Sequence, residues 1–161
     1  MTNQRSDIPR RFFAKAEQAR IVDAIAAAEL RTSGEIRFHL ERDVPAGPPV
    51  AGDPYLQARR VFDDLGMHRT ADRNGVLVYM AVRSRKFAVV GDEELHARVG
   101  DGFWSDVVEA MGREFGEGRF AKGLETGIAL IGEKLCEFFP YQDDDVNELP
   151  DEISYGDDVR D

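Results

Sequence analysis

The continuous apolar run Val76–Val82 (VLVYMAV) constrains the fold of this chain more than any other feature. Seven apolar residues in succession, rich in types that favour β-structure, are typical of a central strand buried on both faces. The run is far shorter than the roughly 20 residues that a membrane-spanning helix needs, and no longer apolar stretch stands elsewhere. The sequence therefore predicts a central strand here and no transmembrane segment.

Two further strands are predicted on either side of this run. Residues Glu35–Asp43 alternate apolar and polar side chains, which indicates a half-buried strand. Residues Phe87–Val90 follow the central run after a polar four-residue turn, as in an antiparallel hairpin. A helix predicted from Pro54 to Leu65 would connect the first two strands, so we expect them to be parallel. The result is an α/β fold with a small mixed sheet.

Helical periodicity accounts for most of the remaining body. Apolar residues recur with helical spacing, and these stripes indicate surfaces facing the core rather than a cofactor. The predicted helices cover residues 10–31, 54–65, 93–99, 104–115 and 124–138.

The chain divides by charge into a balanced body and an acidic end. Of its 161 residues, we expect 1–9 to be a polar lead-in, 10–140 one domain and 141–161 an acidic tail. The tail holds nine acidic side chains and one basic one, and it therefore contributes −8 of the net charge of −10. Because no basic stripe is present to neutralise phosphates, we expect no nucleic-acid binding. Leu149 and Ile153 interrupt the charges, so this segment is expected either to be solvated or to dock on the body or on a protein partner.

Cysteine, histidine and the N-terminus exclude several classes of site. The single cysteine, Cys136, cannot form an internal disulfide and is expected as a reduced thiol in the core or at its boundary. The three histidines lie on separate predicted elements, which argues against zinc. No apolar segment like that of a secretory signal begins the chain, so we expect a soluble, cytoplasmic protein.

Oxygen-bearing side chains gather at one end of the predicted sheet. The start of the first strand, the start of the second and the end of the hairpin's second strand meet at this end. Those positions carry Glu35, Asp72, Asn74 and Asp92, and Asp101 follows shortly after. Hard oxygen donors from several loops suit calcium or magnesium. The alternative is that these are turn and capping residues, with Asp101 as a helix N-cap.

Three strings together resemble the TPM domain family: Thr32-Ser-Gly-Glu-Ile36, Gly66-Met-His-Arg-Thr-Ala-Asp-Arg-Asn-Gly-Val-Leu77 and Arg85-Lys-Phe-Ala-Val-Val-Gly-Asp92. The resemblance covers about residues 12–155, and the chain is similar to a soluble bacterial branch of the family. It implies a three-layer α/β/α sandwich with an acidic groove that takes calcium or a similar divalent ion. An acid phosphatase activity is attributed to plant members. The matching positions are Glu35, Asp72, Arg73, Asn74 and Asp92.

Two hypotheses for function follow. In the first, the domain binds a divalent cation and has an interaction or regulatory role. In the second, it is a metal-assisted acid phosphatase acting on phosphomonoesters, with Arg73 holding the phosphate and Asp72 or Asp92 as nucleophile or base. Many relatives carry a signal peptide and a membrane anchor, and we expect neither in this chain. Some relatives have a Gly-aromatic-Gly where this chain has Gly91-Asp92-Glu93.

Overall fold

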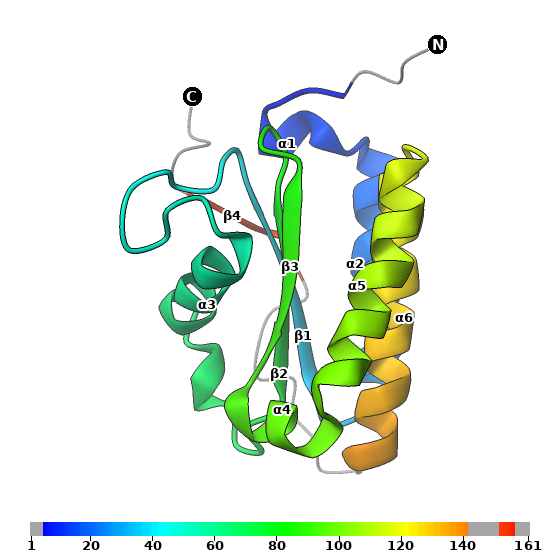
Figure 1. The fold of residues 1–161 in the computed structure, drawn as a ribbon. Coiled ribbons are helices and arrows are strands. Elements are labelled where there is room, and N and C mark those ends of the chain that lie inside the picture. The colour runs from blue at the N-terminus through cyan, green and yellow to red at the C-terminus, as the bar shows by residue number, and fades with distance from the viewer. Residues whose placement is uncertain (1–4, 142–151, 157–161) are drawn as a thin grey trace.

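A four-stranded mixed sheet forms the centre of the molecule in the computed structural model, which describes residues 5–141 and 152–156 (Figure 1). The strand order is β3-β2-β1-β4. Strand β1 runs parallel to β2 and to β4, while β3 is antiparallel to β2, so the mixed sheet and the strand directions predicted from the sequence are confirmed. The strands are β1 (Glu35–Glu41), β2 (Gly75–Ala81), β3 (Lys86–Gly91) and β4 (Ser154–Tyr155).

Helices cover both faces of this sheet and give the expected three layers (Figure 1). Helices α2, α5 and α6 lie on one face and α3 on the other, while the short α4 and η1 lie near one end of the sheet. Within the described residues, no helix is both long and apolar enough to cross a membrane. The bounds are α1 (Pro9–Phe12), α2 (Lys15–Glu29), α3 (Pro54–Asp64), η1 (Met67–Arg69), α4 (Glu93–Val99), α5 (Asp101–Gly116) and α6 (Phe120–Phe138).

Strand β2 is buried along its whole length and separates two apolar clusters. Val76, Val78 and Met80 belong to the cluster under α2, α5 and α6. Leu77 and Tyr79 belong to the cluster under α3. Because successive strand residues point to opposite faces, a strand between two helical layers needs apolar residues at every position. This explains the uninterrupted apolar run in the sequence.

The predicted single helix over residues 10–31 is wrong, because the chain breaks between α1 and α2. Phe12 and Phe13 are both buried, with ring centroids 4.9 Å apart, and Phe13, the C-cap of α1, takes the extended backbone conformation that ends the helix. The break is stabilised locally. The backbone N–H of Ala14 donates to Glu17 Oε1 at 3.0 Å, and Arg5 donates to the Phe12 carbonyl at 2.9 Å.

Strand β4 lies within the segment expected to be an acidic tail. Ser154 pairs with His39 in the parallel register, and the Gly156 N–H donates to the Leu40 carbonyl at 3.0 Å. The possibility that this segment docks on the body therefore applies to residues 152–156. Residues 142–151 and 157–161, which hold most of the predicted acidic tail, lie outside the described residues.

Candidate functional site

Three separate segments meet at the end of the sheet where β1 and β2 begin (Figure 1). Glu35 pairs with Gly75 across the two parallel strands. On the other side of β2, the N–H of Asp92 donates to the Gly75 carbonyl at 2.9 Å. The residues before β1, the loop before β2 and the residue after β3 are therefore neighbours, as the strand directions predicted.

A short chain of hydrogen bonds joins the first two segments. The hydroxyl of Ser33 donates to Asp72 Oδ2 at 3.4 Å, and Nδ2 of Asn74 donates to Ser33 Oγ at 3.4 Å. Asn74 is buried, whereas Asp72 is exposed. Ser33 was not among the predicted site residues, although it stands in the Thr-Ser-Gly-Glu string that carries the family resemblance. We call Ser33, Asp72 and Asn74 the oxygen corner.

Asp92 is the centre of a second arrangement. Its side chain is fully buried, and both of its carboxylate oxygens accept hydrogen bonds. Oδ1 accepts from the backbone N–H of Glu94 at 3.1 Å as the N-cap of α4, and Oδ2 accepts from Arg73 Nε at 2.9 Å. Hydrogen bonding and attraction to Asp92 raise the pKa of the Arg73 guanidinium above its usual value. Arg73 reaches this position from the left-handed backbone region, at φ 52°.

Close packing fixes the end of β3 beside Asp92. A Cβ added to Gly91 would lie 2.5 Å from Cζ2 of Trp104, so the indole occupies the space that a side chain would need. On the other side, Arg59 of α3 donates to the Gly91 carbonyl and to Glu93, both at 3.3 Å. Arg59 was not predicted, because helical spacing does not show that a guanidinium reaches across to a strand end.

The remaining predicted residues have different surroundings. Glu35 is buried at the first position of β1. Asp101 is exposed and pairs with His96, with Nε2 and Oδ1 2.7 Å apart. The alternative role of Asp101 as N-cap of α5 is wrong: Gly100 takes the N-cap position, and no side chain caps this helix.

The donor set at this end of the sheet is mixed rather than purely acidic. Among residues 5–141 and 152–156, no group of three or more His, Cys, Asp or Glu side chains is placed to hold a metal ion. The oxygen corner instead contains one carboxylate, one hydroxyl and one side-chain amide, whose Nδ2 faces Ser33. In the same loop, Thr70 is buried and its hydroxyl has no hydrogen-bond partner among the described residues. Such neutral and charged oxygens fit hard cations that keep part of their water shell.

Comparison with known proteins identifies the family. The model of the TPM domain matches residues 9–134. The chain belongs to the TPM domain family. Its fold is similar to the NMR structure of the BA42 protein from the psychrophilic bacterium Bizionia argentinensis, with a TM-score of 0.82 and 40% sequence identity over 91% of this chain and 97% of that one. No curated protein gives a significant match.

This TPM domain contains a second polar cluster that sequence reasoning did not find, between the sheet and α3. The carboxylate of Glu41 accepts hydrogen bonds from Tyr79 at 2.6 Å, from Gln57 at 3.1 and 3.2 Å, and from His39 Nε2 at 3.2 Å. With Nε2 protonated, Nδ1 of His39 accepts from the Ser154 hydroxyl at 2.8 Å. We call these residues the Glu41 cluster.

The Glu41 cluster explains how β4 is held. Ser154 lies beyond residue 134, where the family match ends, yet it bonds to a residue of β1. Burial raises the pKa of Glu41, but the hydrogen bonds from His39, Tyr79 and Gln57 outweigh burial and bring its pKa below the ordinary value. The carboxylate is thus ionised in the fold, and it connects β1, β2, α3 and, through His39, β4.

Proposed function

We propose that the oxygen corner binds a divalent cation, calcium or magnesium, and that this TPM domain has an interaction or regulatory role that depends on the ion. The observation that carries the proposal is the hydrogen-bonded chain of Asp72, Ser33 and Asn74, which brings oxygen-bearing side chains from two loops together. Asp72 is exposed at this corner, so a hydrated cation has access to a carboxylate.

Burial around the corner supports the same proposal. Glu35 and Asn74 are 3% and 1% exposed, so packing at the start of β1 and at the end of the loop before β2 fixes two side chains next to the exposed Asp72. A preorganised set loses less conformational freedom on binding than flexible surface carboxylates do. The ligands in this proposal are the carboxylate of Asp72, the Ser33 hydroxyl and water, joined by the Asn74 amide oxygen if the amide turns over from the orientation in which Nδ2 donates to Ser33.

The ion pair with Arg73 is the reason why Asp92 is not among the proposed cation ligands. A buried carboxylate requires a positive partner, and Arg73 supplies that charge in the structure. Asp92 becomes a ligand only if a cation displaces the guanidinium, which is 40% exposed and free to turn toward solvent. Asp101 is also omitted, because its carboxylate pairs with His96.

Calorimetric titration of calcium and of magnesium into metal-free protein tests the proposal. Asp72→Asn removes the one exposed carboxylate of the corner and should weaken binding by at least about tenfold, since ligand charge sets the affinity of such sites. Asp106→Asn is the matched control, because Asp106 is an exposed aspartate on α5. Equal affinities in the two variants would contradict the proposed site.

A second candidate function, a metal-assisted acid phosphatase, rests on Arg73. Its partly exposed guanidinium follows Asp72 directly in the chain and would hold a phosphomonoester next to the cation. Arg73→Ala distinguishes the two candidates. If the protein is a phosphatase, the Arg73→Ala variant should lose turnover of p-nitrophenyl phosphate. If it is a binding domain, the variant should keep its cation affinity, and the parent protein itself should show no metal-dependent turnover. We favour binding, because both oxygens of Asp92 are already engaged.

A further inference from the structure

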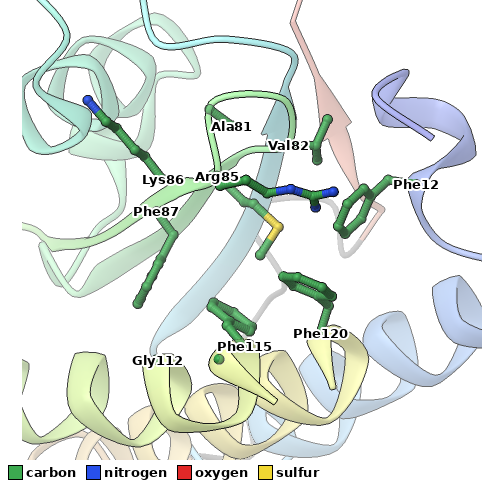
Figure 2. A pocket seen from close by; sticks show the side chains of 11 residues that line it. Phe12, Ala81, Val82, Arg85, Lys86, Phe87, Gly112, Phe115 and Phe120 are labelled. Carbon is green, nitrogen blue, oxygen red and sulfur yellow. The ribbon is translucent and has the colours of Figure 1, made fainter. Parts of the chain in front are cut away.

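An apolar pocket lies at the opposite end of β2 and β3 from the oxygen corner (Figure 2). It has a volume of about 340 Å³ and opens between the hairpin, the end of α5 and the start of α6. This volume is within the range of small-molecule sites. The side chains of Phe12, Met80, Phe87, Phe115 and Phe120 form most of its apolar wall.

Aromatic contacts hold the wall in shape. Phe87 meets Phe115 edge to face, with ring centroids 4.8 Å apart, and Phe12 meets Phe120 in the same way at 5.1 Å. Phe115 and Phe120 stack on each other at 5.5 Å, which joins the two pairs. Gly112 keeps one side of the pocket open, since a Cβ there would meet only Phe87, at 3.8 Å.

Arg85 supplies a positive charge at the edge of this apolar wall. Its guanidinium carbon lies 5.1 Å from the centroid of the Phe12 ring and 5.4 Å from that of Phe120. Figure 2 shows Arg85 extending toward Phe12, while Lys86 points away from the aromatic rings and donates to the Gly52 carbonyl at 3.0 Å. Among the ion pairs of the described residues, Arg5 is matched by Glu17, whereas Arg85 has no carboxylate partner.

We propose that this pocket binds a small hydrophobic carboxylate, a molecule with an apolar body and one carboxylate group. The phenylalanine rings would remove the apolar body from water. The exposed guanidinium of Arg85 would bind the carboxylate through two parallel N–H donors, a geometry that a lysine does not offer. Cation–π contacts with Phe12 and Phe120 hold the guanidinium at the edge of the pocket.

The site is independent of the proposed cation site. Met80 and Ala81, at the end of β2, line the pocket, whereas Gly75, at the start of β2, lies beside Asp92. Failure of one proposal therefore leaves the other unaffected. The two sites are distinguished by which residues change their amide NMR shifts when each ligand is added to the same protein.

Octanoate is the probe for the test, titrated below its micelle concentration while residue-resolved amide shifts are followed. We expect saturable shifts at residues 80–87 and 112–120. 1-Octanol, which has the same chain without the charge, should bind more weakly by about fivefold, the effect of one exposed ion pair. Arg85→Gln should lower octanoate affinity to that of 1-octanol and leave 1-octanol binding unchanged. Arg113→Gln, an exposed arginine on α5, is the charge-matched control.

Gly112→Leu tests the volume of the pocket and should abolish binding of both probes. Arg85 is exposed, so Arg85→Gln should fold. This variant therefore tests whether Arg85 binds the carboxylate of octanoate even if Gly112→Leu does not fold. The proposal is overturned if octanoate causes no saturable shifts at residues 80–87 and 112–120, or shifts confined to other regions. It is also overturned if Arg85→Gln binds octanoate as tightly as Arg113→Gln does.

Discussion

The fully buried carboxylate of Asp92 accepts a hydrogen bond of 2.9 Å from Nε of Arg73, which ties the loop before β2 to the residue after β3. The same carboxylate caps α4. One side chain therefore organises three neighbouring parts of the candidate site. Because Arg73 already neutralises the carboxylate of Asp92, a cation that bound Asp92 would have to displace Arg73. A cation that bound Asp72 would have to displace no arginine.

Replacing Asp92 should destabilise the domain more than the loss of a helix cap alone. Asp92→Ala removes the cap of α4 and leaves Arg73 without its carboxylate. Loss of an N-cap typically costs about 1 kcal/mol. Asp53→Ala is the matched control, because Asp53 caps α3 at 2.9 Å and has no arginine partner in the described structure. Chemical denaturation should show a larger loss of unfolding free energy for Asp92→Ala, and equal losses would show that the Arg73 pair contributes nothing.

A side chain at Gly91 should be poorly tolerated. Gly91→Ala places a Cβ 2.5 Å from the Trp104 ring, so the indole must move away from the strand. Overpacking of this kind costs about 1–3 kcal/mol. At Gly102, in the first turn of α5, a Cβ meets nothing within 4 Å, so Gly102→Ala should keep or slightly raise thermal stability. Similar melting temperatures for the two variants would mean that Trp104 does not pack against β3 as described.

The Glu41 cluster should make stability depend on acid pH. The pKa of Glu41 lies below its ordinary value of 4.5, so the folded protein holds the ionised form more favourably than the unfolded chain does. This contribution is fully present above pH 4.5 and is lost as the pH falls through the lower pKa of the folded state. Glu41→Gln should therefore reduce the unfolding free energy at pH 7 by about 2 kcal/mol, the scale of a hydrogen bond to a charged group.

Urea denaturation of the parent and of Glu41→Gln from pH 7 to pH 3 measures this effect. The difference between the two proteins should shrink as the pH falls below 4.5. Glu109→Gln is the control, because Glu109 is exposed and pairs with Arg113 on the same helix. That variant should stay within about 0.5 kcal/mol of the parent at every pH. A constant difference for Glu41→Gln across this range would contradict an ionised, stabilising Glu41.

Strand β4 should open more easily when its link to His39 is removed. Ser154→Ala deletes the hydroxyl that donates to His39 at 2.8 Å, a bond worth about 1 kcal/mol. Amide hydrogen exchange of Gly156, whose N–H donates to Leu40, should therefore become about fivefold faster. Ser105→Ala, at an exposed position of α5, should leave that amide unchanged. Identical exchange in the two variants would show that the Ser154 hydroxyl does not hold the strand.

Periodicity in the sequence predicted β1, β2 and β3, their directions and most of the helices. These elements bury a face or a stripe, so the pattern of apolar residues follows directly from the structure. Strand β4 has only two residues, too few to show an alternation, and its position depends on backbone pairing and on the bond between Ser154 and His39. The break before α2 depends on two adjacent phenylalanines finding separate space in the core, which helical spacing does not show.

For the candidate site, the sequence predicted which segments meet but not how their side chains pair. Strand direction placed Glu35, Asn74 and Asp92 at one end of the sheet. The ion pair of Arg73 with Asp92 and the contact of His96 with Asp101 depend on side-chain reach across turns. The pocket near Arg85 was not predicted, because its phenylalanines come from four separate elements and nothing in the sequence shows that they meet.

Titration of calcium, and separately of magnesium, into metal-free protein with residue-resolved amide NMR tests the central claim most directly. The proposed site predicts saturable shifts confined to residues 33–35 and 72–75, with smaller shifts at 91–93 if Arg73 moves away from Asp92. Asp72→Asn should remove the shifts, and Asp106→Asn should retain them. Shifts only at residues 143–158, or none with either ion, would contradict a cation site at this end of the sheet.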